Sequence, residues 1–197
     1  MKVYNFSPGP AKLDSSIISK SQEAMYNFQN TGLSILEIGH RSKEFEKLMN
    51  SLQENIRNIF NVPTNYFTLF LQGGATFQNT FIANNFDMRD KDLGCLVTGT
   101  WGKSTFDDFS KIRETKLIEL SQDEIENFVE SGEDLKNVDY LHLTSNETIN
   151  GVQLREFNKI NHDSLLIDMS SDIGSYRFEW DNVCLLYTSP SPRDLLK

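Results

Sequence analysis

The sequence predicts an α/β fold in which a mostly parallel sheet carries helices on both faces. Two observations lead to this prediction. Short apolar segments typical of buried strands alternate with longer helical segments, and a glycine pair, Gly73-Gly74, lies between one such strand and the next helix. Strands that alternate with helices form parallel sheets, because each connection crosses over the sheet. Ligands of such sheets bind at the carboxyl ends of the strands.

The first residues are predicted to form an extended arm followed by a helix. Two prolines and a glycine at positions 8–10 keep residues 5–13 out of a helix. A helix is expected over residues 15–28, and Gly32 ends it. Residues 33–41 are expected to be a loop or a short strand.

The clearest helix is predicted over residues 42–61. Its apolar residues recur at three- and four-residue steps, which places them on one face. Ser42 is a suitable N-cap, and Pro63 bars continuation of the helix.

The rest of the chain alternates strands with helices. Helices are expected over 76–86 and 102–111, and a third opens at the capping box of Ser121 and Glu124. Strands are expected over residues 66–71, 93–98, 140–144 and 164–169.

Composition excludes several classes of protein. The chain of 197 residues has 38% apolar and 24% charged residues, which suits one sizeable globular core. Its net charge of −9 argues against a nucleic-acid partner, which requires a basic face. We find neither an apolar run of about 18 residues that would cross a membrane nor the apolar stretch of a signal peptide. Two cysteines and three scattered histidines predict no disulfide framework and no metal site, and a cytoplasmic setting is expected.

The segment Gln72–Thr76 has the features of an anion cradle. It joins a predicted strand to a predicted helix, where successive backbone N–H groups face a ligand and small residues let a phosphate approach. Thr76 adds a hydroxyl donor. The alternative is a plain strand–turn–helix connection.

Asp168 ends a predicted apolar strand, Leu165-Leu166-Ile167. A carboxylate at the end of a buried strand is costly unless it is paired. In enzymes that use pyridoxal 5′-phosphate (PLP), such a carboxylate pairs with the protonated pyridine nitrogen and keeps the ring an electron sink. The alternative is a helix N-cap or a loop carboxylate.

Two further segments follow predicted strands. Trp101 could stack on a flat cofactor ring, although a lone tryptophan more often belongs to a core or an interface. Residues 145–148 supply hydroxyl and amide groups, and Asn146-Glu147-Thr148 also matches a glycosylation acceptor. Without a secretory signal, the glycosylation interpretation is disfavoured.

His40 and Arg41 are candidate ligands of an acidic group. Arginine offers a planar fork that binds a carboxylate or a phosphate through two hydrogen bonds. The alternative is a surface salt bridge from Arg41 to Glu37 or Glu44.

The order of these motifs resembles that of the phosphoserine aminotransferases, a family of PLP enzymes of fold type I. The resemblance covers residue 3 to about residue 187, roughly the first half of a typical member. The segments that carry it are residues 5–11, 39–45, 70–76, 145–151 and 168–173.

The resemblance implies a PLP-binding large domain and a role in L-serine biosynthesis. The implied reaction exchanges an amino group between O-phospho-L-serine plus 2-oxoglutarate and 3-phosphohydroxypyruvate plus L-glutamate, in a homodimer. The implied roles are phosphate binding by Ala75 and Thr76, ring stacking by Trp101, contact with the phenolic oxygen by Thr148, contact with the pyridine nitrogen by Asp168, and binding of the acidic substrate by His40 and Arg41.

The chain departs from the family pattern after Tyr187. In the family, a tyrosine here is followed by Ala-Gly-Ala-Gln-Lys-Asn, whose lysine forms the Schiff base with PLP. Pro192 occupies that position in this sequence, so no catalytic lysine is expected and the chain is expected to be inactive. The implied organisation is an arm over 1–14, a partial, truncated large domain over 15–187, and an unrelated, artefactual tail over 188–197.

Two alternatives stay open on the sequence. One is another PLP enzyme of fold type I, such as a cysteine desulfurase. The strings at residues 39–42 and 145–148 favour phosphoserine transamination over sulfur chemistry. The other is a non-catalytic fragment, either a binding module or a piece that does not fold alone.

Overall fold

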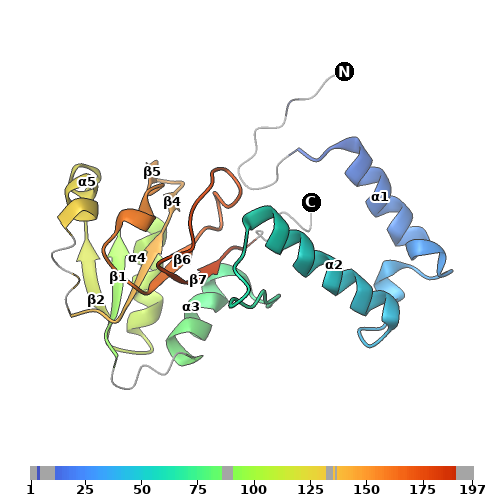
Figure 1. The fold of residues 1–197 in the computed structure, drawn as a ribbon, viewed down its shortest axis with the longest axis horizontal. Coiled ribbons are helices and arrows are strands. Elements are labelled where there is room, and N and C mark those ends of the chain that lie inside the picture. Colours follow the sequence, from blue (N-terminus) through green and yellow to red (C-terminus); the bar gives the residue numbers. More distant parts are fainter. Residues whose placement is uncertain (1–3, 5–11, 86–90, 132–134, 136, 190–197) are drawn as a thin grey trace. The chain divides into compact units, whose positions relative to one another are not determined.

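The computed structural model describes Tyr4 and residues 12–85, 91–131, 135 and 137–189 (Figure 1). The chain divides into two compact units, one up to Leu69 and one from Phe70 to Leu195. Each unit is considered by itself. The predicted arm lies outside the described residues up to position 11, apart from Tyr4.

The first unit is helical. It contains α1 (Ser15–Tyr26), the 3₁₀ turns η1 (Phe28–Asn30) and η2 (Ile35–Glu37), and α2 (Lys43–Phe60). Both predicted helices are confirmed, and α1 ends two residues earlier than expected. Residues 35–37 form a 3₁₀ turn rather than a strand, because Ser34 and Glu37 make a reciprocal capping box there.

Helix α2 begins and ends as its sequence predicts. The Ser42 hydroxyl accepts a hydrogen bond from the Phe45 N–H at 3.2 Å. Asn61 closes the helix in the left-handed conformation, with φ +49°, which asparagine tolerates better than most residues.

The predicted strand over residues 66–71 is wrong. The carbonyls of Tyr66 and Thr68 accept hydrogen bonds from the side chains of Arg57 and Gln53 on α2, the latter at 3.1 Å. These backbone groups are thus satisfied without a neighbouring strand. The apolar pattern that suggested a strand is largely exposed, and Phe67 is 90% accessible to solvent.

The second unit is built on a five-stranded parallel sheet, so the predicted α/β fold is confirmed. The strand order is β2-β1-β3-β6-β7, and every neighbouring pair is parallel (Figure 1). The strands are β1 (Leu93–Val97), β2 (Lys116–Glu119), β3 (Tyr140–Thr144), β6 (Leu165–Asp168) and β7 (Val183–Tyr187).

Strand β7 was not among the expected strands, and two further elements of this unit were not expected either. Strand β2 lies at the edge of the sheet and buries only Ile118, so its sequence lacks the continuous apolar run of its neighbours. A small antiparallel hairpin pairs β4 (Asn146–Glu147) with β5 (Val152–Gln153) directly after β3.

Helices cover both faces of the sheet, as predicted. Helices α3 (Gly74–Asn85) and α4 (Thr100–Ser110) share one core cluster with Cys95 and Leu166. Helix α5 (Gln122–Ser131) and the turn η4 (Phe157–Lys159) share another with their neighbours in the strands, Leu96 and Leu165. Alternate strand residues thus point to opposite faces, which requires the near-continuous apolar runs seen in the sequence.

A buried polar cluster ties β7 to the helices of the first face. The Tyr187 hydroxyl donates to Asn79 Oδ1 at 3.0 Å and lies 2.8 Å from His142 Nε2. Asn79 Nδ2 donates in turn to Asp108 Oδ2 on α4 at 3.2 Å. Burial lowers the pKa of His142 to about 3, so the ring is neutral and its Nε2–H donates to Tyr187.

We predict that Tyr187→Phe lowers the free energy of unfolding by about 1–3 kcal/mol, because Asn79 Oδ1 and His142 Nε2 lose the hydrogen bonds that they make with the Tyr187 hydroxyl. Denaturant unfolding followed by tryptophan fluorescence measures this, since Trp101 and Trp180 both lie in the second unit.

The matched control is Tyr26→Phe, which removes the same oxygen from a side chain that is 89% exposed. It is expected to change the free energy of unfolding by less than about 0.5 kcal/mol. Equal effects of the two substitutions would contradict a structural role for the buried cluster.

Candidate functional site

The candidate site lies at the carboxyl ends of β1, β3 and β6. Thr144 pairs in register with Asp168, so these two strands end side by side. The segment after β1 leads into α4, and the segment after β3 forms the small hairpin. The described site residues of the second unit therefore meet at the edge where parallel sheets bind ligands.

Asp168 is a buried carboxylate that forms no ion pair with a basic side chain of the described residues. The residue is 8% exposed, and its Oδ1 accepts a hydrogen bond from the Ser170 N–H at 2.8 Å. Burial raises its pKa, and the negative charges of Asp172 and Glu147 raise it further. A cationic ligand would relieve the cost of burying this charge.

Trp101 and Thr148 are in direct contact. The indole Nε1–H donates to Thr148 Oγ1 at 2.9 Å, which fixes the orientation of the ring. The Trp101 residue is still 47% exposed, so part of it is accessible to a ligand. The alternative of a core tryptophan does not describe this residue.

The glycine turn before α3 has the backbone shape of an anion cradle. Gly73 and Gly74 have φ values of +94° and +64°, a region that favours glycine. A Cβ at Gly73 would lie 2.3 Å from Phe77 Cγ. Helix α3 begins at Gly74, two residues before the predicted start, which places half-buried Ala75 and exposed Thr76 in its first turn. The N–H groups of a first turn have no helical acceptor.

Short contacts connect the glycine turn with the end of β6. A Cβ at Gly74 would lie 3.1 Å from Ser189 Oγ. The Ser189 N–H donates to Ser170 Oγ at 3.1 Å, and Ser170 is the residue that bonds Asp168. Ser189, two residues after β7, therefore lies close both to the glycine turn and to the segment that follows Asp168.

The sequence alone did not reveal a role for Glu147. Its carboxylate is fully buried and accepts hydrogen bonds from the N–H groups of Trp101, at 2.7 Å, and Gly102, at 2.6 Å. The available signal was weak: an acidic residue that follows a buried strand, and glycines at positions 99 and 102. Only the fold brings these segments together.

His40 and Arg41 belong to the first unit. Both are exposed in the turn that precedes α2, where the Ser42 N–H donates to Gly39 O at 2.9 Å. No ion pair links Arg41 to Glu37 or Glu44, all three of which are described. The guanidinium is therefore not engaged in the alternative surface salt bridge.

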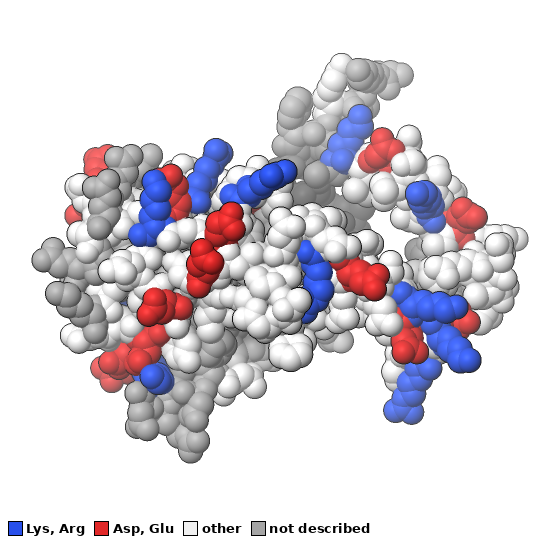
Figure 2. Space-filling view, viewed as in Figure 1, with Lys and Arg blue, Asp and Glu red and all other residues white. Residues whose placement is uncertain are grey.

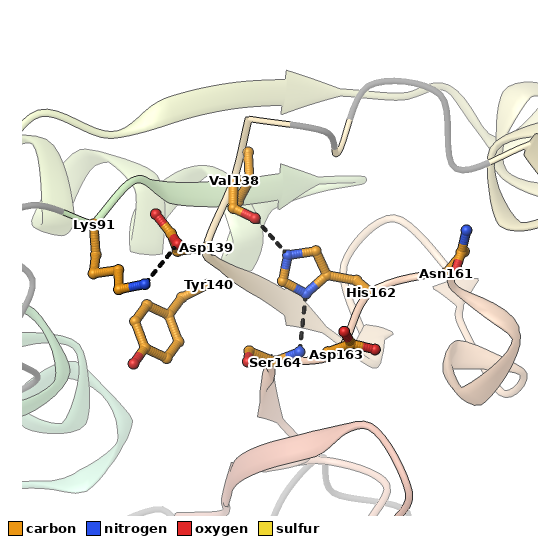
Figure 3. A pocket seen from close by; sticks show the side chains of 8 residues that line it. All are labelled: Lys91, Val138, Asp139, Tyr140, Asn161, His162, Asp163 and Ser164. Atoms are coloured by element: carbon orange, nitrogen blue, oxygen red, sulfur yellow. Dashed lines mark hydrogen bonds and ion pairs between the residues drawn. The ribbon is translucent and has the colours of Figure 1, made fainter.

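A separate shallow hollow lies at the amino ends of β3 and β6, opposite the candidate site (Figure 3). Several of its polar groups bond to one another. Lys91 pairs with Asp139 at 3.0 Å, and His162 Nε2 donates to Val138 O at 2.8 Å while its Nδ1 accepts from the Ser164 N–H at 3.1 Å.

Neither a metal cluster nor a membrane span is present among the residues described. No set of three or more His, Cys, Asp or Glu side chains there could hold a metal ion. No helix in those ranges combines the length and apolar character needed to cross a bilayer.

Known proteins resemble this chain in both sequence and fold. The phosphoserine aminotransferase of Geobacillus kaustophilus is 37% identical over 190 residues, which are 94% of this chain and 52% of the relative. The structure of phosphoserine aminotransferase from Bacillus circulans subsp. alkalophilus superposes with a TM-score of 0.82 at 34% identity, over 95% of this chain and 53% of that one. A PLP-bound phosphoserine aminotransferase from Trichomonas vaginalis gives 0.79 at 29% identity, over 95% and 57%.

These relatives confirm the predicted resemblance and the PLP-transferase fold of the large domain. The chain spans about half the length of the curated relatives it matches. The family model for class-V aminotransferases matches residues 3–189, nearly the whole sequence. The chain therefore belongs to the class-V aminotransferase family.

Proposed function

We propose that this chain forms the cofactor-binding part of a PLP-dependent phosphoserine transaminase. The reaction is the exchange of an amino group between O-phospho-L-serine plus 2-oxoglutarate and 3-phosphohydroxypyruvate plus L-glutamate. The observation that carries the proposal is Asp168, a buried carboxylate at the carboxyl edge of the sheet that forms no ion pair within the described part of the chain. The relatives named phosphoserine aminotransferase support this substrate class.

The residues present fit PLP. A protonated pyridine nitrogen would supply the positive charge that Asp168 lacks, and the buried carboxylate would keep that proton in place. PLP, when bound, supplies an electron sink for the exchange of the amino group. The role of Asp168 is to hold one proton on the ring nitrogen.

The other site residues would orient the group. The N–H groups at Ala75 and Thr76, in the first turn of α3, would hold the phosphate. The indole of Trp101, a partly exposed residue, would stack on the ring. Thr148 already bonds the Trp101 indole, and its hydroxyl proton is free to donate to the phenolic oxygen.

His40 and Arg41 are proposed to bind the acidic substrate. Both side chains are exposed, and the planar fork of arginine suits a carboxylate or a phosphate. We propose that the complete enzyme is a homodimer of the cytoplasm. On the face drawn in Figure 2, basic side chains lie among acidic ones, which supports the view that nucleic acid is not a partner.

The proposed organisation keeps an arm over residues 1–14, the PLP-binding part over 15–187 and an unrelated tail over 188–197. The tail lies outside the described residues from position 190, and so does Pro192. A cysteine desulfurase is not favoured, since the relatives that match in both sequence and structure are named phosphoserine aminotransferases.

We predict that Asp168→Asn raises the free energy of unfolding of the ligand-free chain by about 1 kcal/mol at pH 7, as is common where a functional group strains its site. Because burial raises the pKa of Asp168, its ionised form destabilises the fold above that raised pKa. This loss of stability disappears as the pH falls toward 3.8, the ordinary pKa of an aspartate. The difference in free energy of unfolding between Asp168→Asn and the wild type should therefore shrink as the pH falls. Denaturant unfolding at pH 7 and pH 4 measures the effect.

Asp172→Asn is the matched control. Asp172 accepts hydrogen bonds from Ser145 Oγ at 2.6 Å and from Gln153 Nε2 at 3.4 Å, which an amide replaces poorly. The free energy of unfolding of this variant is expected to be about 1 kcal/mol lower than that of the wild type. If Asp168→Asn also lost stability at pH 7, the carboxylate would be a structural group rather than one that awaits a cation.

PLP binding tests the proposed function directly. We expect Trp101→Ala and Asp168→Asn each to raise the PLP dissociation constant about tenfold, through loss of ring stacking and of the charge pair. Equilibrium dialysis with PLP provides the measurement. Phe67→Ala removes another exposed aromatic side chain, in the first unit, and should leave the constant unchanged. Equal constants for all three variants would refute the proposed site.

The chain as it stands is expected to show no transaminase activity, since Pro192 lies where the family has its lysine. Incubation with PLP, phosphoserine and 2-oxoglutarate should yield no glutamate. Borohydride treatment followed by peptide mass analysis should find no lysine labelled in stoichiometric amount.

The positive control replaces residues 188–193 with the family's Ala-Gly-Ala-Gln-Lys-Asn. This variant should acquire one pyridoxyl label, at position 192. A stoichiometric label on a lysine of the unmodified chain, together with turnover, would show that the chemistry uses a different lysine.

A further inference from the structure

We propose that Glu147 is a positioning residue that sets the place and orientation of the Trp101 indole in the site. The proposal rests on the proposed function, because the ring that Trp101 would support is that of PLP. Glu147 itself faces the backbone of α4 rather than the open edge of the sheet. It therefore acts through Trp101 and not on a ligand.

The carboxylate of Glu147 holds the first turn of α4 with both of its oxygens. Oε2 accepts from the Trp101 N–H at 2.7 Å, and Oε1 accepts from the Gly102 N–H at 2.6 Å. Bonds of this length to a carboxylate are among the stronger hydrogen bonds in proteins. They satisfy two of the N–H groups that a helix start leaves without an acceptor.

The same hairpin fixes the indole and the preceding residue. Thr148, next to Glu147, accepts the Trp101 indole N–H at 2.9 Å. Asn150 Oδ1 accepts from the Thr100 N–H at 2.8 Å and from its hydroxyl at 2.9 Å. One short segment after β3 thus holds the backbone of Trp101, its ring, and the residue before it.

The sequence leaves room for Glu147 at two positions. A Cβ at Gly99 would lie 2.8 Å from Glu147 Cδ and 2.6 Å from Asn150 Oδ1. A Cβ at Gly102 would lie 3.0 Å from Glu147 Oε1. The backbone of Gly99 is extended, with φ −178°, so glycine is required there by space and not by conformation.

A plain helix cap does not need this arrangement. A serine or aspartate at position 99 would cap α4 locally, without a buried charge. Here the N-cap is Gly99, which has no side chain, and the acceptor comes from a separate strand end. Because Glu147 follows β3, its contacts fix the backbone of Trp101 relative to that strand. Thr148, next to Glu147, fixes the indole ring in the same way.

Glu147→Gln tests this proposal with almost no change in size. The new amide would present one acceptor and one donor, so either the Trp101 or the Gly102 N–H would face an NH₂ group. The probe is ¹⁵N NMR of the two indole N–H groups, Trp101 and Trp180, in the chain without PLP. We expect the Trp101 indole N–H to exchange with solvent about tenfold faster, as for loss of one hydrogen bond. The NMR signal of this N–H should also shift toward the chemical shift that it has in Thr148→Val, a variant that lacks the hydroxyl acceptor.

Trp180 is the internal control for folding. It packs on Phe178, with ring centroids 5.2 Å apart, in the other core cluster. Glu114→Gln is the matched control variant, because it makes the same change of charge on an exposed side chain. Both the Trp180 signal in Glu147→Gln and the Trp101 signal in Glu114→Gln should match the wild type.

Asn150→Ala is a second test of the proposal, which applies even if Glu147→Gln unfolds the chain. It removes only the contacts to Thr100 from an exposed side chain, and it should move the Trp101 indole signal in the same direction by a smaller amount. An unchanged Trp101 indole in Glu147→Gln overturns the proposal. Movement of both tryptophans in Glu147→Gln, with no movement in Asn150→Ala, overturns it as well.

PLP titration separates this proposal from the proposed function. If the wild type binds PLP, Glu147→Gln should raise the dissociation constant several-fold, in step with the indole shift. If the wild type does not bind PLP, the proposed function fails, while the indole measurements still decide whether Glu147 positions Trp101. Weakened PLP binding in Glu147→Gln with an unmoved indole would assign Glu147 a different role.

Discussion

The parallel ladder between β3, β6 and β7 is the constraint on which the site depends. Register pairs Thr144 with Asp168 and Asp168 with Tyr187, so three strands finish in one row. Strands β3 and β6 are buried on both faces, which leaves the carboxyl ends as the place where polar side chains reach an open edge. The hairpin and the start of α4 collect at that edge because their preceding strands end there. Asp168 ends β6, and Glu147 follows the neighbouring strand β3. Burial, together with the charges of Asp172 and Glu147, holds the pKa of Asp168 above its ordinary value. Glu147 has two backbone N–H donors, whereas Asp168 has one, from Ser170, so Asp168 is the group that a cationic ligand would stabilise.

Local sequence patterns predicted most of the architecture. The amphipathic pattern of α2 and the apolar runs of β1, β3 and β6 each lie within one short segment and predict its structure, and the structure agrees. The prediction of a strand over residues 66–71 was wrong because no strand of the described residues pairs with this segment. Side chains of α2 donate to the carbonyls of Tyr66 and Thr68 instead. Strand β2 was missed because an edge strand buries too little to show a pattern.

Part of the candidate site was predictable, because Trp101, Thr148 and Asp168 lie at or just after the ends of strands. The structure brings Trp101 and Thr148 into contact. Thr148 was implied by the family resemblance, whereas Asp168 and Trp101 could be named from their place after apolar runs. Glu147 could not, because its role depends on N–H groups 45 and 46 positions away in the chain. Such a contact leaves no local pattern apart from the two glycines that make room for it.

The segment after Tyr187 decides what this edge can do. The Tyr187 hydroxyl forms hydrogen bonds with His142 on β3 and Asn79 on α3, so the end of β7 is fixed relative to the sheet and to α3. The chain then runs past Ser170 to Ser189, which lies close both to Gly74 of the proposed phosphate turn and to the segment that follows Asp168. In the proposed function, the residues after Ser189 determine whether a lysine can reach PLP, and Pro192 stands at the position of the family's lysine.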